Sequence, residues 1–176
     1  MSSLNLLCLS FQECHLLPQI TSSLSEILSL PVTLGKIDRH LNQYFQKDRD
    51  QYDASRILSD FEKTVSVGKT VLITSVDLYI PIFTYVFGLA KLKGDAAIVS
   101  AYRLDATFYG LPKDETLLKQ RLVKEVIHEL GHLLNLRHCS DYRCVMSSSN
   151  TADELDVKQD RYCQYCLDDI SEFLPK

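Results

Sequence analysis

Residues 126–139 read VIHELGHLLNLRHC, and this stretch decides how the rest of the chain is interpreted. His128 and His132 are four residues apart on a segment of helical character, so both imidazoles leave one face of the helix about one turn apart. Two imidazoles in that arrangement can share a tetrahedral metal ion, which favours zinc. Glu129 lies about 100° around the helix from His128, which places its carboxylate beside the metal as a base and not on it as a ligand.

A third histidine can join them only if the helix stops. On a straight helix, His138 would lie about 15 Å beyond His128. Asn135 supplies the stop, because asparagine is second only to glycine in adopting the left-handed conformation that ends helices, where its short amide bonds to the local backbone. We therefore predict that the chain turns back at Asn135 and presents His138 to the same metal.

The complete pattern resembles the zinc signature of the metzincin metalloproteases, H-E-x-x-H-x-x-G-x-x-H with a methionine downstream. Asn135 stands where that family has glycine, and Met146 stands at the place of the methionine. The likeness extends to the archaemetzincin branch, in which cysteines hold a second, structural zinc. Four cysteines carry this part of the resemblance: Cys139, Cys144, Cys163 and Cys166. The resemblance implies a catalytic zinc on the histidines, a structural zinc on these cysteines, and Met146 as packing below the metal. Its motifs cover Leu117 to Cys166.

The cysteine spacing independently favours a metal site. A C-x4-C pair is followed, after 18 residues, by C-x-x-C, which is close to the spacing of closed four-cysteine zinc sites. Disulfides or free thiols are the alternative. Cys8 and the pair Cys14-His15 could be drawn as a further metal cluster, but we expect plain core residues there. His40 is expected on a loop or at the surface. With one ion on the three histidines and one on the four cysteines, two zinc ions per chain are predicted.

Length and charge narrow the class of protein. A chain of 176 residues is expected to form one domain with a sizeable core. The net charge is −4 and no run of lysine or arginine occurs, so neither nucleic acid nor an anionic membrane surface is suggested as a partner. We expect a peptide or protein substrate and a monomer.

Three features of the sequence lead us to expect a cytoplasmic location. Leu4 to Phe11 is apolar but lacks a basic start and a small-residue cleavage site, so it favours a strand over a signal peptide. Leu78 to Ala90 is uncharged but contains Pro81 and is too short to span a bilayer. The six cysteines are expected to be thiols for metal, because the cytosol keeps thiols reduced.

The first part of the chain alternates strands and helices, which predicts a parallel α/β sheet. The predicted strands are Leu4–Ser10, Pro31–Ile37 and Lys69–Val76. The predicted helices are Ile20–Leu30, after a turn at Pro18, and Asp53–Thr64. A hairpin then adds an antiparallel strand, with Thr84–Leu89 and Ala96–Ala101 joined across Lys93-Gly94-Asp95.

The second part begins with a long helix from about Lys113 or Asp114 to Leu134, which carries the first two histidines. A polar loop over Asn150–Gln159 and a closing helix over Gln164–Leu174 follow. The metzincin resemblance implies an α/β (α+β) fold with a twisted mixed sheet, an antiparallel edge strand that borders the substrate cleft, a backing helix, an active-site helix and a small C-terminal subdomain. We expect one catalytic domain, with residues 1–134 as its upper part and 135–176 as its C-terminal part.

These features predict a zinc-dependent metallopeptidase in which Glu129 acts as general base toward a zinc-activated water. Ser148 stands where some metzincins have a tyrosine that helps to stabilise the transition state. The alternative is a non-catalytic or vestigial dizinc protein that binds peptides or partners. A third hypothesis is a redox or zinc-buffering module built on the cysteines.

Overall fold

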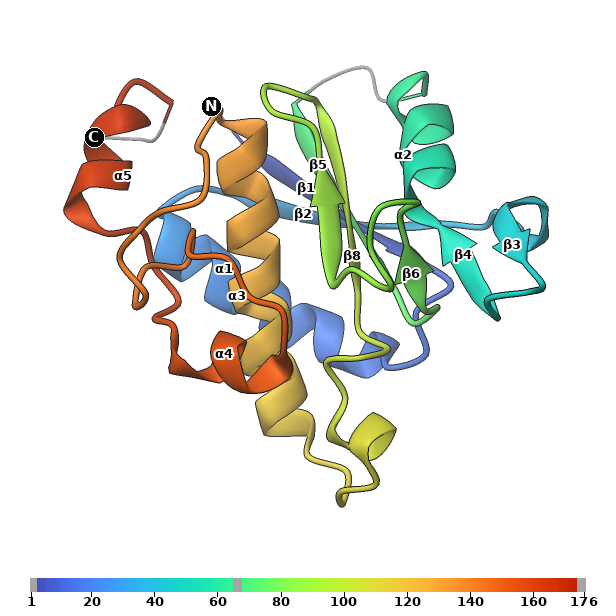
Figure 1. Ribbon diagram of the computed structural model, residues 1–176. Coiled ribbons are helices and arrows are strands. Elements are labelled where there is room, and N and C mark those ends of the chain that lie inside the picture. Colours follow the sequence, from blue (N-terminus) through green and yellow to red (C-terminus); the bar gives the residue numbers. More distant parts are fainter. Residues whose placement is uncertain (1–2, 65–67, 174–176) are drawn as a thin grey trace.

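A five-stranded sheet and the long helix α3 (Glu115–Leu133) form the centre of the molecule (Figure 1). The computed structural model describes residues 3–64 and 68–173. Across the sheet the order is β2 (Val32–Ile37), β1 (Leu4–Leu9), β5 (Lys69–Thr74), β8 (Ala96–Ser100) and β7 (Gly88–Ala90). The first four strands are parallel, and β7 pairs antiparallel with β8 at the edge. The predicted mixed sheet with an antiparallel edge strand is confirmed.

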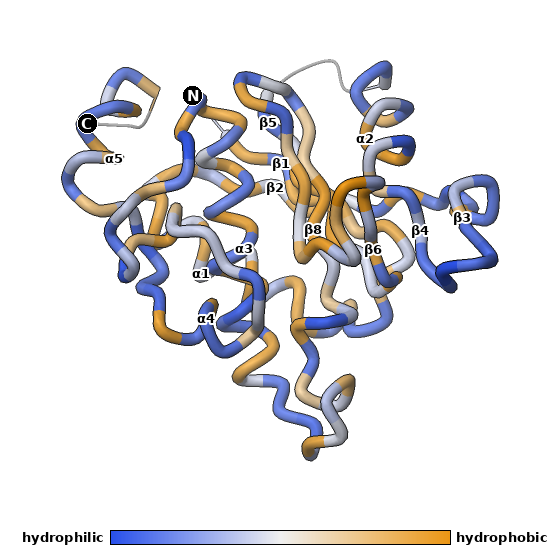
Figure 2. The backbone as a smooth tube through the Cα atoms, in the orientation of Figure 1, coloured by the Kyte–Doolittle hydropathy of each residue, from blue (hydrophilic) through white to orange (hydrophobic). Residues whose placement is uncertain are grey.

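Helices cover both faces of this sheet. Successive side chains of a strand point to opposite faces, so Leu4 and Leu6 pack into the core under α3 and α1 (Leu17–Leu28), whereas Leu9 packs into the core under α2 (Ala54–Glu62). Figure 2 shows the apolar central strands between these helical layers. The layering places the C-terminal end of α3 beside the edge strand β7.

The first of the two early helices differs from the prediction mainly at its start, and the second is slightly shorter than predicted at both ends. α1 begins at Leu17, before the predicted Ile20, and Pro18 lies in its first turn instead of in a preceding turn. Proline is tolerated there because the first N–H groups of a helix have no helical partner. α2 is capped by Asp53, whose carboxylate accepts a hydrogen bond from the Arg56 N–H at 3.1 Å.

A second, small sheet was not predicted. It contains β3 (Phe45–Gln46), β4 (Gln51–Asp53) and β6 (Leu78–Tyr79), which are too short for periodicity to reveal. Single helical turns form at η1 (Cys14–Leu16), η2 (Asn42–Tyr44) and η3 (Ala106–Tyr109).

The edge strand is shorter than the predicted Thr84–Leu89. Its first residues form a loop because Arg49 donates hydrogen bonds to the Phe83 and Thr84 carbonyls, each at 3.0 Å, and Gln51 donates to the Thr84 carbonyl at 3.0 Å. These bonds hold the carbonyls against the small sheet and away from β8. The strand itself begins only at Gly88.

The chain after α3 returns along that helix (Figure 1). The predicted polar loop Asn150–Gln159 is wrong, because it contains α4 (Ala152–Val157), whose first turn is capped by the Thr151 hydroxyl. Arg121 of α3 fixes α4 by donating to both carboxylate oxygens of Asp156, at 2.8 and 2.6 Å.

The last helix, α5 (Gln164–Asp169), is shorter than the predicted Gln164–Leu174. Leu174 lies outside the described residues. No helix in residues 3–64 or 68–173 combines the length and the apolar character needed to cross a membrane.

Candidate metal centre and active site

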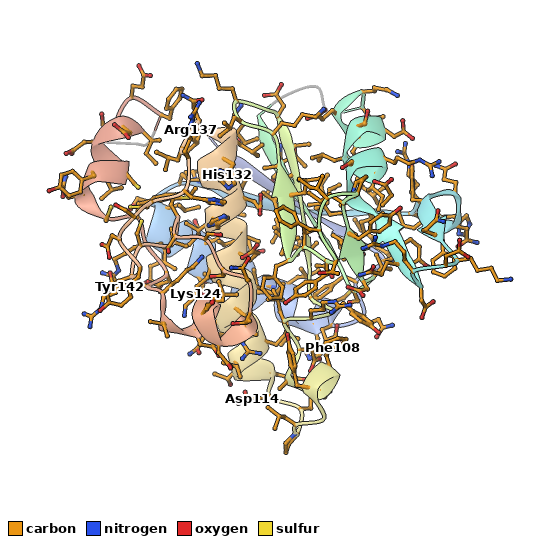
Figure 3. The ribbon with its side chains drawn as sticks, viewed as in Figure 1. Phe108, Asp114, Lys124, His132, Arg137 and Tyr142 are labelled. Carbon is orange, nitrogen blue, oxygen red and sulfur yellow. The ribbon has the colours of Figure 1, made fainter. Side chains whose placement is uncertain are left out.

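Three imidazoles converge at the C-terminal end of α3. His128 and His132 project from the helix, and His138 comes from the segment that turns back after it; Figure 3 labels His132 on the helix, with Asp114 at the opposite end. The Nε2 atoms of His128 and His132 are 3.1 Å apart, and the candidate ligand atoms of all three residues lie within 4.8 Å of one another. Nitrogens bound to one tetrahedral zinc at about 2.0–2.1 Å are about 3.4 Å apart. The three rings could therefore hold one zinc ion.

Backbone carbonyls set the orientation of the two helical imidazoles. Nδ1 of His128 lies 2.8 Å from the Val145 carbonyl, and Nδ1 of His132 lies 2.8 Å from the Leu136 carbonyl. A carbonyl can only accept, so Nδ1 must donate in each ring and Nε2 is left with a free lone pair.

Burial favours the neutral form of these imidazoles, which is the form that binds metal. Burial, with a smaller contribution from the neighbouring His132 and Lys158 charges, lowers the pKa of His128 to about 3. Burial also lowers the pKa of His132 and of His138.

The turn at Asn135 forms as predicted. Asn135 has a φ of 76°, in the left-handed region. The Leu136 N–H donates to the Gly131 carbonyl at 2.8 Å, and the Asn135 N–H donates to the His132 carbonyl at 2.9 Å. These are the two hydrogen bonds of a Schellman motif, which ends a helix and redirects the chain. The redirected segment carries His138.

Met146 packs directly below the helix that carries the histidines. It is fully buried, and a Cβ on Gly131 would lie 2.3 Å from its Sδ. Only glycine therefore allows this close approach. A glycine inside a helix costs about 1 kcal/mol relative to alanine, and this was the sequence signal that could have predicted the contact.

Glu129 is buried against the edge strand. A Cβ on Gly88 would lie 2.6 Å from Glu129 Oε1, and the other oxygen, Oε2, has no hydrogen-bond partner among the described residues. Burial, and then the charge of Glu125, raises the pKa of Glu129 well above its usual value. A buried carboxyl oxygen without a hydrogen-bond partner needs an explanation. A cation held by the adjacent imidazoles would favour the ionised form of Glu129.

Two further ionisable groups lie in the site, and sequence reasoning missed both. Glu125 is one turn before Glu129, and burial raises its pKa to about 7. An acid inside an apolar helical stripe was the available signal. Lys158 is also buried, and burial lowers its pKa. It lies in the segment predicted to be a polar loop, where nothing in the sequence distinguished it.

These groups line a cleft of about 300 Å³. Residues of the predicted edge segment, including Tyr85, Phe87 and Leu89, form one side of it. Glu125, Glu129 and the three histidines form the opposite side. Ser148 and Lys158 also line the cleft.

The four cysteines form a second cluster. Sγ of Cys139 is 3.7 Å from Sγ of Cys163, and Sγ of Cys144 is 3.8 Å from Sγ of Cys166. Sulfurs of a tetrahedral site with bonds of about 2.3 Å to zinc are about 3.8 Å apart, whereas a disulfide requires about 2.05 Å. All four are free cysteines, and their Sγ atoms lie within 4.8 Å of one another. The cluster therefore has the dimensions of a metal site.

The N-terminal cysteines lie apart from both clusters. Cys8 is buried in the core as expected, but Cys14 is exposed, so its assignment to the core is wrong. Cys14 is exposed because it lies in η1, beyond the end of β1, although its Sγ still donates to the Phe11 carbonyl at 2.8 Å and lies 3.4 Å from Sγ of Cys8. His15 is exposed and pairs with Glu115 at 3.1 Å. His40 lies on an exposed loop, as predicted.

Comparisons with known proteins agree with this geometry. The sequence profile described as "Peptidase family M54" matches residues 19–172. An archaemetzincin of Methanocaldococcus jannaschii is 38% identical over 159 residues, which cover 90% of this chain and 87% of that protein. An archaemetzincin of Pyrococcus horikoshii is 41% identical over 135 residues, covering 75% of this chain and 72% of that protein.

Solved structures are similar over nearly the whole chain. A zinc-dependent peptidase from Methanocorpusculum labreanum superimposes with a TM-score of 0.86 at 32% identity, covering 95% of this chain and 99% of that one. Archaemetzincin from Archaeoglobus fulgidus gives a TM-score of 0.81 at 31% identity, with coverage of 96% and 99%. The fold implied by the sequence resemblance is thus confirmed.

Proposed function

The chain belongs to peptidase family M54 and is a zinc metallopeptidase, and we propose that His128, His132 and His138 hold its catalytic zinc while Glu129 is its general base. One observation carries the proposal. Three ligand nitrogens converge beside a buried carboxyl oxygen that has no partner among the described residues. A purely structural metal site would not need that carboxyl group.

The reaction follows from these positions. A zinc ion held by the three imidazoles would supply Lewis acidity, which would lower the pKa of the attacking water toward neutral and polarise the scissile carbonyl. Glu129 takes the proton of the attacking water and returns it to the leaving amine, so one carboxylate serves first as base and then as acid. Gly88 leaves the space in which this carboxylate lies.

The edge strand offers a way to orient the substrate. β7 pairs with β8 on one side, and its other side borders the cleft. An extended peptide can add to such an edge through main-chain hydrogen bonds. In this arrangement the substrate is held by its backbone, and its scissile carbonyl lies between β7 and the histidines.

Cys139, Cys144, Cys163 and Cys166 hold a second zinc in this proposal, giving two ions per chain. Because a closed four-cysteine site has no open position, its role is structural. It joins the segment that follows His138 to the start of α5. The thiols must stay reduced for this purpose, which fits a cytoplasmic location.

Profiling against a diverse peptide mixture tests the function. Zinc-loaded wild type and Glu129→Gln are compared by mass spectrometry of the products, with zinc content measured on the same samples. We expect cleavage by wild type to exceed that by the variant by at least about 10²-fold, at equal zinc content, because general acid–base catalysis contributes about that much. Equal and negligible cleavage by both proteins would favour the non-catalytic dizinc alternative.

A further inference from the structure

Lys158 places a buried positive charge in the floor of the cleft. Lys158 is only 4% exposed, although lysine is almost never fully buried without a partner. Among the described residues that line the cleft, it is the one lysine or arginine. A cation in this position needs a reason, because moving an ammonium group out of water is costly.

The ammonium group binds the segment that supports the first histidine. Lys158 Nζ donates hydrogen bonds to the Val145 carbonyl at 3.4 Å and to the Ser147 carbonyl. The Val145 carbonyl also accepts the hydrogen bond from Nδ1 of His128. Lys158 therefore holds the acceptor that orients the His128 ring, and it fixes the chain on either side of Met146.

Lys158 lines the same cleft as two buried acids, Glu125 and Glu129. Burial lowers the pKa of Lys158, and the negative charges of Glu125 and Glu129, with those of Cys144 and Glu154, oppose this shift. Glu125 and Glu129 lie one helical turn apart in a site with little solvent. Two such carboxyl groups repel each other when both are ionised, so a nearby cation stabilises the arrangement.

The main chain at Lys158 is fixed independently of the cleft. Its N–H donates to the Leu155 carbonyl at 3.2 Å, and the Gln159 N–H donates to the Arg143 carbonyl at 2.8 Å. From outside the cleft, Lys124 of α3 anchors α4 through hydrogen bonds to the Leu155 and Asp156 carbonyls, at 3.1 and 3.0 Å. Figure 3 labels Lys124 on α3, between His132 and Asp114. The Lys158 side chain is therefore not needed to hold its own main chain in place, and its ammonium group can bind carbonyls at the cleft.

We propose that Lys158 is a positioning residue of the active site, which holds the Val145 carbonyl against His128 and fixes the chain on either side of Met146. The inference rests on the proposed three-histidine zinc site. Lys158 acts through these groups and not on the substrate. Outer-shell partners of metal ligands typically change metal affinity or activity by about 10–100-fold when they are replaced.

The first test compares Lys158→Met with Lys124→Met. Each variant removes an ammonium group that binds two backbone carbonyls, but only the first group lies in the cleft. Zinc release to a chromogenic chelator is followed over time, and His132→Ala identifies the phase that belongs to the three-histidine site.

We expect Lys158→Met to accelerate that phase about 10–100-fold and to lower kcat by a similar factor, with little change in KM. Lys124→Met is expected to lower the melting temperature while leaving zinc release and kcat unchanged. Equal zinc release from the two variants would overturn the proposal. Because zinc release needs no cleavage assay, this outcome is distinct from a failure of the peptidase function.

A second pair of variants covers the case in which Lys158→Met does not fold. Zinc release from Lys158→Gln is then compared with that from Lys124→Gln, and faster release from the first supports the proposal. Equal release from these two variants again overturns it.

Discussion

The Glu129 carboxylate lies directly against the main chain of Gly88, so close that a Cβ at position 88 would approach Oε1 to 2.6 Å. The proposed base is therefore positioned by a residue on the opposite side of the cleft. β7 borders the cleft and also sets where the carboxylate can lie. This relationship leads to the first prediction.

Gly88→Ala should displace the Glu129 carboxylate and lower peptide cleavage by about 10²-fold, since a shift of about 1 Å in a reacting group has an effect of that size. Zinc content should remain unchanged, because the atoms nearest to a Cβ at position 88 all belong to Glu129 and not to the proposed ligands. Kinetics and elemental analysis of the same preparation check both statements. Wild-type activity in this variant would show that Glu129 is not the base.

Asn135 should accept glycine and reject a β-branched residue. Its φ of 76° is available to glycine without strain, whereas a branched side chain is a genuine outlier there. We expect Asn135→Gly to preserve the zinc affinity of the three-histidine site and Asn135→Val to weaken it, as measured by competition with a chelator. Equal affinities for Asn135→Val and wild type would mean that the turn does not determine the position of His138.

Replacing one cysteine of the cluster should remove one zinc ion and much of the stability. Cys163→Ala is expected to lower the zinc content from two ions per chain to one and to reduce the melting temperature markedly, because structural zinc binding is part of the folding free energy. Cys14→Ala is the matched control, since Cys14 is an exposed cysteine residue outside the cluster. Unchanged metal content and melting in Cys163→Ala would refute the structural zinc.

The buried acid Glu125 should give the zinc-free site a specific pH dependence. Its folded-state pKa is raised from 4.5 to about 7, mainly by burial. The folded state therefore binds the proton more tightly, so this contribution to stability is complete below about pH 4.5 and is lost as the pH rises through about 7.

Glu125→Gln removes this contribution, and the comparison is best made in a His132→Ala background, which lacks the catalytic zinc. We expect the free energy of unfolding of Glu125→Gln to rise relative to its parent between about pH 4.5 and 7. Denaturant titrations at several pH values measure the difference. Parallel pH profiles for the two proteins would contradict the burial of an ionisable group at this position.

Elements with a strong local pattern were predicted well, and those defined by distant contacts were not. α3 follows its apolar stripe and its Asp114 cap, so its bounds nearly match the prediction. α4 was missed because it is short and is held in place by Arg121 of α3. The start of β7 was misplaced because Arg49, distant in the sequence, holds the preceding carbonyls.

The sequence by itself determined the set of candidate ligands and its local geometry. The spacing of His128 and His132 is a property of any helix, and the left-handed turn at Asn135 depends on the side chain and its immediate backbone. Both follow from short-range sterics, so no knowledge of the fold was needed. The cysteine spacing likewise predicted the second cluster.

Only the tertiary structure decided what surrounds those ligands. Gly88 makes room for Glu129, Gly131 makes room for Met146, and Lys158 reaches the carbonyl that orients His128. Each contact joins segments that are far apart in the chain, and close packing alone determines which side chains meet. The environment that sets the charge of Glu129 could therefore not be predicted from the motif that contains it.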